Sequence, residues 1–270
     1  MFFPLHDDNP TRRTPVLTFG IIGLNALVFL WSLQLSPIQR RQLNVTRGFI
    51  PARVRQLAEP EPITVPFTPR MEDRFGRVVP ARHVELPPDR GEVLLSLVTS
   101  MFLHAGLMHL LGNMWFLWLF GNNVEDRLGP SLFIVLYLGG GLLATGCHWL
   151  TNPGATVPVI GASGAVAAVL GAYFITWPWA RIHTLVFLFI FITVVQVPAV
   201  VVLGAWFLGQ LLAGHQALQA GDPQGVAWWA HIGGFVAGLA LMPLFDALVG
   251  DAKPPRRAQT REDTWDDTWE

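Results

Sequence analysis

The chain has 270 residues, of which 51% are hydrophobic and only 14% are charged, and its formal net charge is −1. Soluble domains usually carry about 25% charged residues, so the deficit indicates a membrane protein. The balanced net charge gives no indication of nucleic-acid binding, which is usually accompanied by a strongly basic chain. The single cysteine, Cys147, excludes an internal disulfide.

Apolar runs divide the chain into predicted membrane spans, because a spanning helix needs about 20 mostly apolar residues. Residues 1–14 precede these runs as a polar segment, and the first run is long enough to stay in the membrane rather than act as a cleaved signal peptide. The six predicted helices cover residues 15–35, 107–124, 130–150, 158–177, 184–212 and 226–248. The fold class predicted from this pattern is an all-α polytopic membrane protein, with its membrane domain over residues 15–248.

A polar segment separates the first two predicted helices. Residues 36–92 hold ten of the 18 Lys and Arg residues, all ten of them arginines, and nine prolines that disfavour a long helix. We expect residues 36–106 to form a long first outer loop region containing short amphipathic pieces.

The basic residues of the short loops predict the orientation in the membrane, because cytoplasmic loops are enriched in Lys and Arg. Arg127 and Arg181 fall on the side that six spans assign to both termini, whereas the loop "TNPGATVP" (151–158) on the opposite side has no basic residue. We therefore expect cytoplasmic termini, with a flexible cytoplasmic tail over residues 249–270.

Four polar side chains lie at a similar predicted depth in the membrane. With this orientation the second, fourth and sixth helices each begin at the outer surface, and His109, Ser163 and His231 lie near their starts. At 1.5 Å rise per residue, these three residues are roughly 5–10 Å below that surface. Asn113 follows His109 at i,i+4 on the same helix face. Polar groups at membrane depth are costly, so the set predicts a functional site.

The chemistry of this set favours acyl transfer. A serine hydroxyl becomes an effective nucleophile when a general base takes its proton, and imidazole suits that role at neutral pH. His109, Asn113 and the backbone N–H groups at a helix start are candidate donors to an oxyanion. Because no carboxylate lies at this depth to orient His231, the sequence predicts a Ser–His dyad.

The small residues around Ser163 also have a packing interpretation. "PVIGASGAVAAVLG" (158–171) is typical of a helix that contacts another helix, and Gly234 and Gly238 form a GxxxG motif of the same kind. The two interpretations are compatible, because close backbones bring the short side chains of Ser163 and His231 within reach of each other.

Three segments in this order resemble the rhomboid family of intramembrane serine proteases: "HLLGNMWFLWLFG" (109–121), "GASGA" (161–165) and "AHIGGFVAG" (230–238). "GNNVEDRLG" (121–129) is also similar to the family, and the opening segment is similar to many bacterial members. The resemblance implies a six-helix bundle that hydrolyses peptide bonds in or next to transmembrane segments of protein substrates, with no cofactor, metal, nucleotide or nucleic acid. It also implies the bacterial inner membrane and a site that opens outward.

The resemblance assigns a role to each matching residue. Ser163 is implied to be the nucleophile and His231 the general base and later acid. The implied oxyanion hole consists of the side chains of His109 and Asn113 and the backbone N–H of Ser163. The remaining matches, implied to be structural near the site, are Gly161, Gly164, Gly234, Gly238 and Glu125.

The chain departs from the family pattern four positions after the nucleophile. Members often carry an aromatic residue there, stacked on the catalytic histidine, whereas this chain has Ala167. Trp228 and Phe235 are the candidates to hold the ring instead. In the predicted fifth helix, Pro198 and Gly204 are either ordinary kink residues or softening points of a gate for substrate entry.

Three alternatives remain open from the sequence. A zinc hydrolase would use His104, His109 and His231, although no HExxH spacing is present; outside that alternative, His104 is expected to be structural. A catalytically silent rhomboid-like protein would bind membrane clients. A small-solute transporter lacks support, since no inverted repeat is visible.

Overall fold

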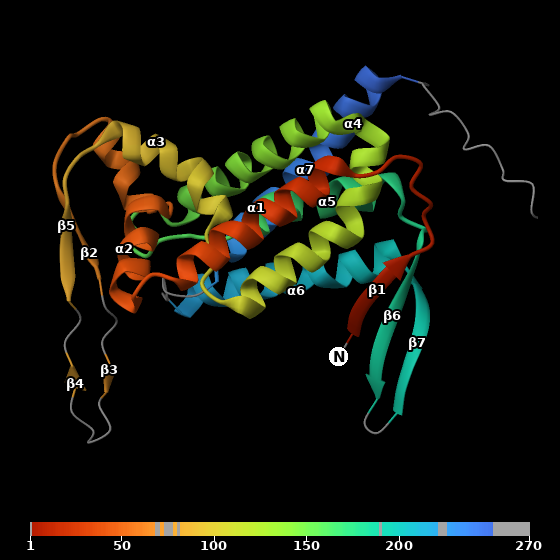
Figure 1. The fold of residues 1–270 in the computed structure, drawn as a ribbon, viewed down its shortest axis with the longest axis horizontal. Coiled ribbons are helices and arrows are strands. Elements are labelled where there is room, and N and C mark those ends of the chain that lie inside the picture. Colours follow the sequence, from red (N-terminus) through yellow and green to blue (C-terminus); the bar gives the residue numbers. More distant parts are fainter. Residues whose placement is uncertain are drawn as a thin grey trace, which may run out of the picture.

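The computed structural model describes residues 2–67, 71–72, 78–79, 82–188, 191–220 and 226–250 (Figure 1). Its helices are α1 (Val16–Leu33), α2 (Pro37–Arg47), α3 (Arg90–Thr99), α4 (Leu107–Thr151), α5 (Ser163–Thr176), α6 (Ala199–Ala220) and α7 (Trp228–Val249), with two 3-10 helices, η1 (Pro51–Leu57) and η2 (Ser100–Phe102). Its strands are β1 (Phe2–Asp7), β2 (Ile63–Pro66), β3 (Met71–Glu72), β4 (Val78–Val79), β5 (His83–Leu86), β6 (Arg181–Leu188) and β7 (Phe191–Pro198).

Four helices of the described chain are long and apolar enough to cross a membrane: α1, α4, α6 and α7. α4 has 45 residues, but Gly129 has non-helical φ and ψ of 73° and 165° and is followed by Pro130. The chain doubles back there (Figure 1), at the boundary expected between the second and third predicted helices. α5 has only 14 residues. The count of six spans stays a prediction.

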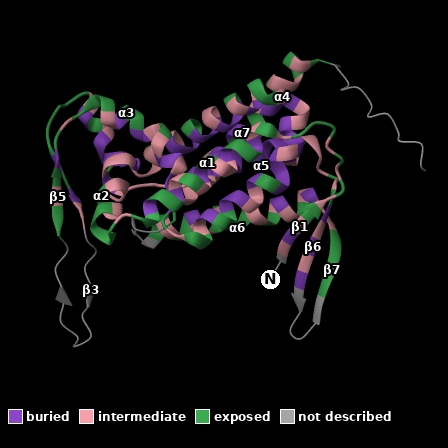
Figure 2. Ribbon diagram, in the orientation of Figure 1, coloured by how far each residue is buried: buried purple, intermediate pink, exposed green. Residues whose placement is uncertain are grey.

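α5 lies at the centre of the helical bundle, packed between α4 and α7. Ten of its 14 residues, from Gly164 to Tyr173, are buried, as the purple ribbon in Figure 2 shows. A Cβ atom at Gly234 would overlap the backbone carbonyl of Gly164, and one at Gly238 would overlap that of Ala168. The small residues therefore set the spacing between α5 and α7, which agrees with the packing interpretation of both stretches.

The outward faces of the long helices carry large apolar side chains. Leu24, Leu27 and Trp31 on α1 are 47%, 67% and 49% exposed. α6 is the least buried of the four long helices. An exposed apolar surface of this extent is expected of helices that face lipid.

The segment between α1 and α4 folds more fully than the expected loop with short amphipathic pieces. α2 begins with a capping box in which the Ser36 side chain accepts from Gln39 N and the Gln39 side chain accepts from Ser36 N. β2 and β5 pair antiparallel. An apolar cluster holds these pieces together; its buried members are Val45, Ile50, Ala52, Ile63, Val65 and Leu86.

The predicted helix over 184–212 is wrong in its first half. Arg181–Leu188 and Phe191–Pro198 form the antiparallel β6–β7 pair, and β1 joins β6 to complete a three-stranded sheet of order β1-β6-β7. The run is rich in β-branched and aromatic residues, which favour strands, and Pro198 ends β7 directly before α6. Pro198 is thus not a kink within a helix, while Gly204 does lie in α6. The chain is mostly helical rather than all-α.

The predicted N-terminal segment and C-terminal tail can be compared with the structure only where their residues are described. Within the predicted N-terminal segment over residues 1–14, Phe2–Asp7 form β1, an element that was not predicted from the sequence. The predicted tail over 249–270 lies outside the described residues except for Val249 and Gly250.

Candidate active site

Ser163 is the first residue of α5, and the backbone before it turns sharply. Gly161 has a φ of 128°, which residues with a side chain rarely adopt. A Cβ at Gly161 would also lie 2.7 Å from Cε1 of His109. Glycine is therefore required at this position, both to turn the chain into α5 and to leave room for the His109 ring.

The start of α5 presents free backbone donors. The first helical hydrogen bond runs from Val166 N to Ala162 O at 2.9 Å, so the N–H of Ser163 is not part of the helical ladder. These N–H groups and the helix dipole favour negative charge next to the Ser163 hydroxyl.

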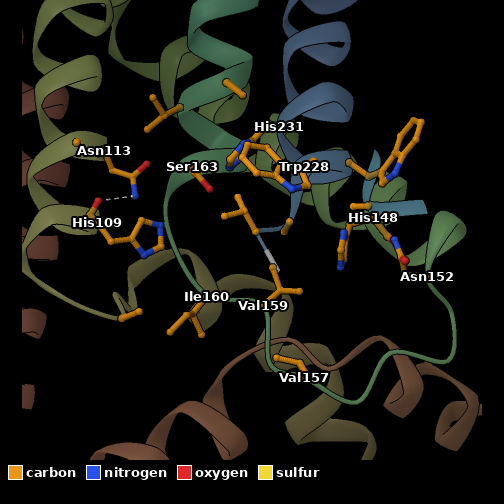
Figure 3. Close-up of a pocket in the computed structure, with 18 of the residues that line it drawn as sticks. His109, Asn113, His148, Asn152, Val157, Val159, Ile160, Ser163, Trp228 and His231 are labelled. Atoms are coloured by element: carbon orange, nitrogen blue, oxygen red, sulfur yellow. Dashed lines mark hydrogen bonds between the residues drawn. The ribbon is translucent and has the colours of Figure 1, made fainter. Parts of the chain in front are cut away.

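A cavity of about 820 Å³ brings the predicted residues together. Ser163 from α5, His231 from α7, and His109 and Asn113 from the first half of α4 all line it (Figure 3). His148, near the C-terminal end of α4, and Asn152, the residue that follows α4, line the same cavity. Three helices that are far apart in sequence thus contribute to one site, as the matched depths predicted.

His231 is held by α6 rather than by α5. Its Nδ1 atom lies 2.7 Å from Oε1 of Gln210. The ring centroid of Trp206, also on α6, lies 6.1 Å from that of His231. The Trp228 ring lies edge-on to the His231 ring, with a centroid distance of 6.1 Å. Trp228 therefore contacts His231 as expected.

One expectation about the His231 environment, the role of Phe235, needs correction. Phe235 stacks on Phe207 at 4.5 Å and lies 6.0 Å from Trp206, both on α6, and it meets Phe174 of α5 edge-on at 5.5 Å. Its described ring contacts therefore do not include His231. Ala167 is fully buried, and its Cβ lies 3.1 Å from where a Cβ on Gly234 would stand. Ala167 therefore packs against α7 and also lines the cavity, where it presents a methyl group in place of an aromatic ring.

Sequence reasoning missed Gln210 and Trp206. The two residues are i,i+4 on α6, in the run "AWFLGQLLAG" (205–214). The available signal was a lone amide in an apolar span, which is the same kind of signal that identified Asn113.

The candidate oxyanion donors lie on α4. Asn113 Nδ2 donates to the carbonyl of His109 at 3.0 Å, and an amide nitrogen has a second hydrogen to offer. His104, just before α4, packs edge-on against the His109 ring at 5.1 Å. Burial, together with the nearby His109, lowers the pKa of His104 to about 4, so this ring is neutral at pH 7. These contacts agree with a structural role for His104.

Glu125 lies away from the cavity and binds the start of α1. Its carboxylate accepts from Leu17 N at 2.9 Å and from Thr18 N and Thr18 Oγ1 at 2.7 and 2.8 Å. α1 has no side-chain cap of its own. Glu125 therefore caps α1 from α4, which is the structural bonding to backbone that was expected of it.

The zinc alternative gains no support from the geometry. Within the described ranges, the group of side chains close enough to hold a metal ion is His6, Asp8 and His183, at the β1–β6 pair. His104, His109 and His231 do not converge in this way.

The comparisons with known proteins agree on one family. The rhomboid domain model matches residues 91–246. Rhomboid protein 1, mitochondrial, of Saccharomyces cerevisiae is 33% identical over 153 residues, covering 54% of this chain and 40% of that protein. Presenilin-associated rhomboid-like protein A, mitochondrial, of Danio rerio is 36% identical over 90 residues, covering 33% and 24%. YdcA of Bacillus subtilis (strain 168), provisionally named a rhomboid protease, is 39% identical over 77 residues, covering 28% and 38%.

The matches span between about a quarter and two fifths of the length of these relatives. Two of the three are named as mitochondrial, so the relatives do not support the expected bacterial inner membrane. The apolar helices indicate an integral membrane protein. The family model covers more than half of the chain, and the chain therefore belongs to the rhomboid family.

Proposed function

We propose that the chain is an intramembrane serine endopeptidase, which cleaves peptide bonds in or next to transmembrane segments of other membrane proteins. The observation that carries the proposal is the single cavity lined by Ser163, His231, His109 and Asn113. Membership of the rhomboid family supports it independently.

In the proposed reaction, Nε2 of His231 takes the proton of the Ser163 hydroxyl as Oγ attacks the substrate carbonyl carbon. The tetrahedral intermediate then collapses, the carbon–nitrogen bond breaks, and His231 gives the proton to the leaving amine. Water, activated by the same imidazole, hydrolyses the acyl-serine and restores the free hydroxyl. Two groups suffice for this cycle, and no cofactor takes part.

The negative charge of the intermediate needs donors that are already in place. The N–H of Ser163, at the start of α5, supplies one donor. The second amide hydrogen of Asn113 and a ring N–H of His109 supply the side-chain donors. The bond from Asn113 to the His109 carbonyl fixes the amide against its own helix, so it is oriented before the substrate arrives.

We further propose how the substrate and water reach the site. The cavity of about 820 Å³ provides a wet chamber in an otherwise apolar bundle. A transmembrane substrate would enter from the lipid past α6, the least buried long helix, and must unwind locally to present its carbonyl. Six spans, with the two halves of α4 crossing separately, would place both termini on the cytoplasmic side and the cavity on the outer side.

The test is cleavage of a membrane-anchored reporter by the purified protein in lipid vesicles. Ser163→Ala and His231→Ala should each abolish cleavage, whereas Ser32→Ala, which removes another buried helical serine, should leave it intact. A fluorophosphonate should label the wild type but not Ser163→Ala. Cleavage that persists in both dyad variants would exclude this mechanism.

The alternative function, a silent client-binding protein, gives a different result in the same experiment. Such a protein would capture the reporter without cutting it, and a fluorophosphonate would not label Ser163. The presence of both Ser163 and His231 in one cavity favours the protease.

A further inference from the structure

Gln210 is a polar side chain in the middle of an apolar helix that faces lipid over much of its surface. α6 covers Ala199–Ala220, and its sequence from Ala199 to Gly209 contains no charged or amide side chain. An amide placed in an apolar surrounding without hydrogen bonds costs several kcal/mol in hydrocarbon-like media, so such a residue is expected to have partners. Gln210 has two partners, one at each end of its amide.

The first partner fixes which way round the amide lies. Nε2 of Gln210 lies 3.3 Å from the backbone carbonyl of Trp206, one turn earlier on α6. A carbonyl oxygen only accepts hydrogen bonds, so the NH2 end of the amide must face it. The oxygen Oε1 is therefore turned towards α7.

The second partner is His231, and the amide orientation decides its protonation. Oε1 of Gln210 lies 2.7 Å from Nδ1 of His231. Because an amide oxygen only accepts, Nδ1 must carry the hydrogen. A neutral imidazole has one N–H, so Nε2 is left with a free lone pair, which is the form that a general base requires.

The His231 ring has no other described hydrogen bond that sets this tautomer. The aromatic contacts of Trp206 and Trp228, with ring centroids 6.1 Å away, restrict the ring without selecting either nitrogen. α5 contributes only the methyl group of Ala167 at the position where an aromatic residue is often found. The other titratable side chains of the cavity, His109 and His148, come from α4.

We propose that Gln210 is the positioning residue of the dyad: by accepting the Nδ1 hydrogen, it holds His231 in the tautomer that can deprotonate Ser163. The catalytic part of this inference rests on the proposed protease function, whereas the tautomer itself does not. Trp206 assists from the same helix, so α6 supplies both the orientation of the base and the wall past which a substrate would enter.

The direct test reads the tautomer by 15N NMR. Full-length protein labelled on histidine nitrogen is placed in lipid nanodiscs at a pH where imidazole is neutral, and His231 is assigned by comparison with His231→Ala. The wild type should show a protonated Nδ1 and an unprotonated Nε2. Gln210→Met, which keeps the length but removes the acceptor, should lose this single state, and Gln219→Met, at an exposed glutamine of the same helix, should keep it. An unchanged His231 spectrum in Gln210→Met, or a wild type protonated on Nε2, would overturn the inference.

The kinetic arm uses the same variants and the membrane reporter. Gln210→Met should lower kcat by on the order of 10–100-fold, by analogy with the loss of a partner that orients a metal-binding histidine, while KM stays within about twofold. A second variant, Gln210→Leu, should behave alike, and the NMR spectra show that both are folded. Equal loss in Gln219→Met, or a change confined to KM, would count against positioning. If Ser163→Ala cleaves as well as the wild type, the protease proposal fails, and the NMR result still decides the role of Gln210.

Discussion

Phe49 and Val159 form an isolated antiparallel bridge in which each residue donates its N–H to the carbonyl of the other, at 3.0 and 2.7 Å. Phe49 belongs to the segment between α1 and α4 and is almost fully buried. Val159 lies four residues before Ser163 and lines the cavity. The folded segment outside the helical bundle thus holds the chain that leads into Ser163.

This bridge predicts that backbone changes at Val159 act on the site. Val159→Pro removes the N–H that binds Phe49 and should loosen residues 155–162, lowering reporter cleavage at least tenfold. Hydrogen exchange at Gly161, whose N–H donates to Ser100 O at 2.9 Å, should become faster. Val159→Ala keeps the backbone donor and is the matched control. If both variants cleave like the wild type, the bridge does not support the site.

The close contact of α5 and α7 predicts a steep penalty for one added methyl group. Gly234→Ala places a Cβ against the Gly164 carbonyl, so the helices must separate, at a cost of about 1–3 kcal/mol of stability. Gly23→Ala on α1 is the control, because nothing lies within 4 Å of its new Cβ. Unfolding in mixed detergent, followed by tryptophan fluorescence, measures both. Equal stabilities would contradict the described packing.

The proposed oxyanion role of Asn113 has a matched control in α1. Asn113→Ala should lower kcat by on the order of 10²-fold, because one donor to the developing charge is lost. Asn25 makes the same bond within its own helix, from Nδ2 to Ile21 O at 2.9 Å, but lies outside the cavity. Asn25→Ala should leave kcat unchanged. An equal loss in both variants would assign Asn113 to stability alone.

The cap that Glu125 provides for α1 predicts a loss of stability without a direct loss of chemistry. Glu125→Ala leaves two backbone N–H groups and the Thr18 hydroxyl without their acceptor, which costs roughly 2–4 kcal/mol. Asp126→Ala removes exposed bonds to Arg12 N and Arg13 N and should cost less than about 1 kcal/mol. Denaturation in detergent compares them. The reverse order of effects would refute the capping role.

Burial of His104 predicts a pH dependence of stability. Its pKa is lowered to about 4 from an ordinary 6.5, so the unfolded chain binds the proton more readily than the folded one between these values. The stability that buried, neutral His104 contributes is therefore fully present above pH 6.5 and is lost as the pH falls towards 4. In His104→Phe the unfolding midpoint should change less with pH in this window than in the wild type. His215→Phe, at an exposed position on α6, should keep the wild-type pH dependence. A wild-type midpoint that stays constant between pH 7 and 4.5 would contradict this.

The placement of three candidate site residues around one cavity could be predicted because a helix has a fixed rise. His109, Ser163 and His231 lie near the starts of three predicted helices, so their depths followed from residue counts alone. The β6–β7 pair could not be predicted in the same way. A short apolar run is compatible with a strand or a buried helix, and periodicity does not separate the two. Only Pro198 marked the boundary. The contact of Gln210 with His231 could not be predicted, because it depends on the side-by-side placement of α6 and α7, which no local sequence pattern specifies.

The shortness of α5 has a consequence for the lipid around it. Fourteen residues rise only about 21 Å, whereas the hydrocarbon layer of a typical bilayer is about 30 Å thick. A helix that carries Ser163, the proposed nucleophile, as its first residue and falls about 9 Å short must either place that residue below the membrane surface or thin the bilayer around it. Membrane thickness thereby becomes a variable of the proposed reaction: lengthening the acyl chains of the surrounding lipids changes how far water must penetrate to reach Ser163.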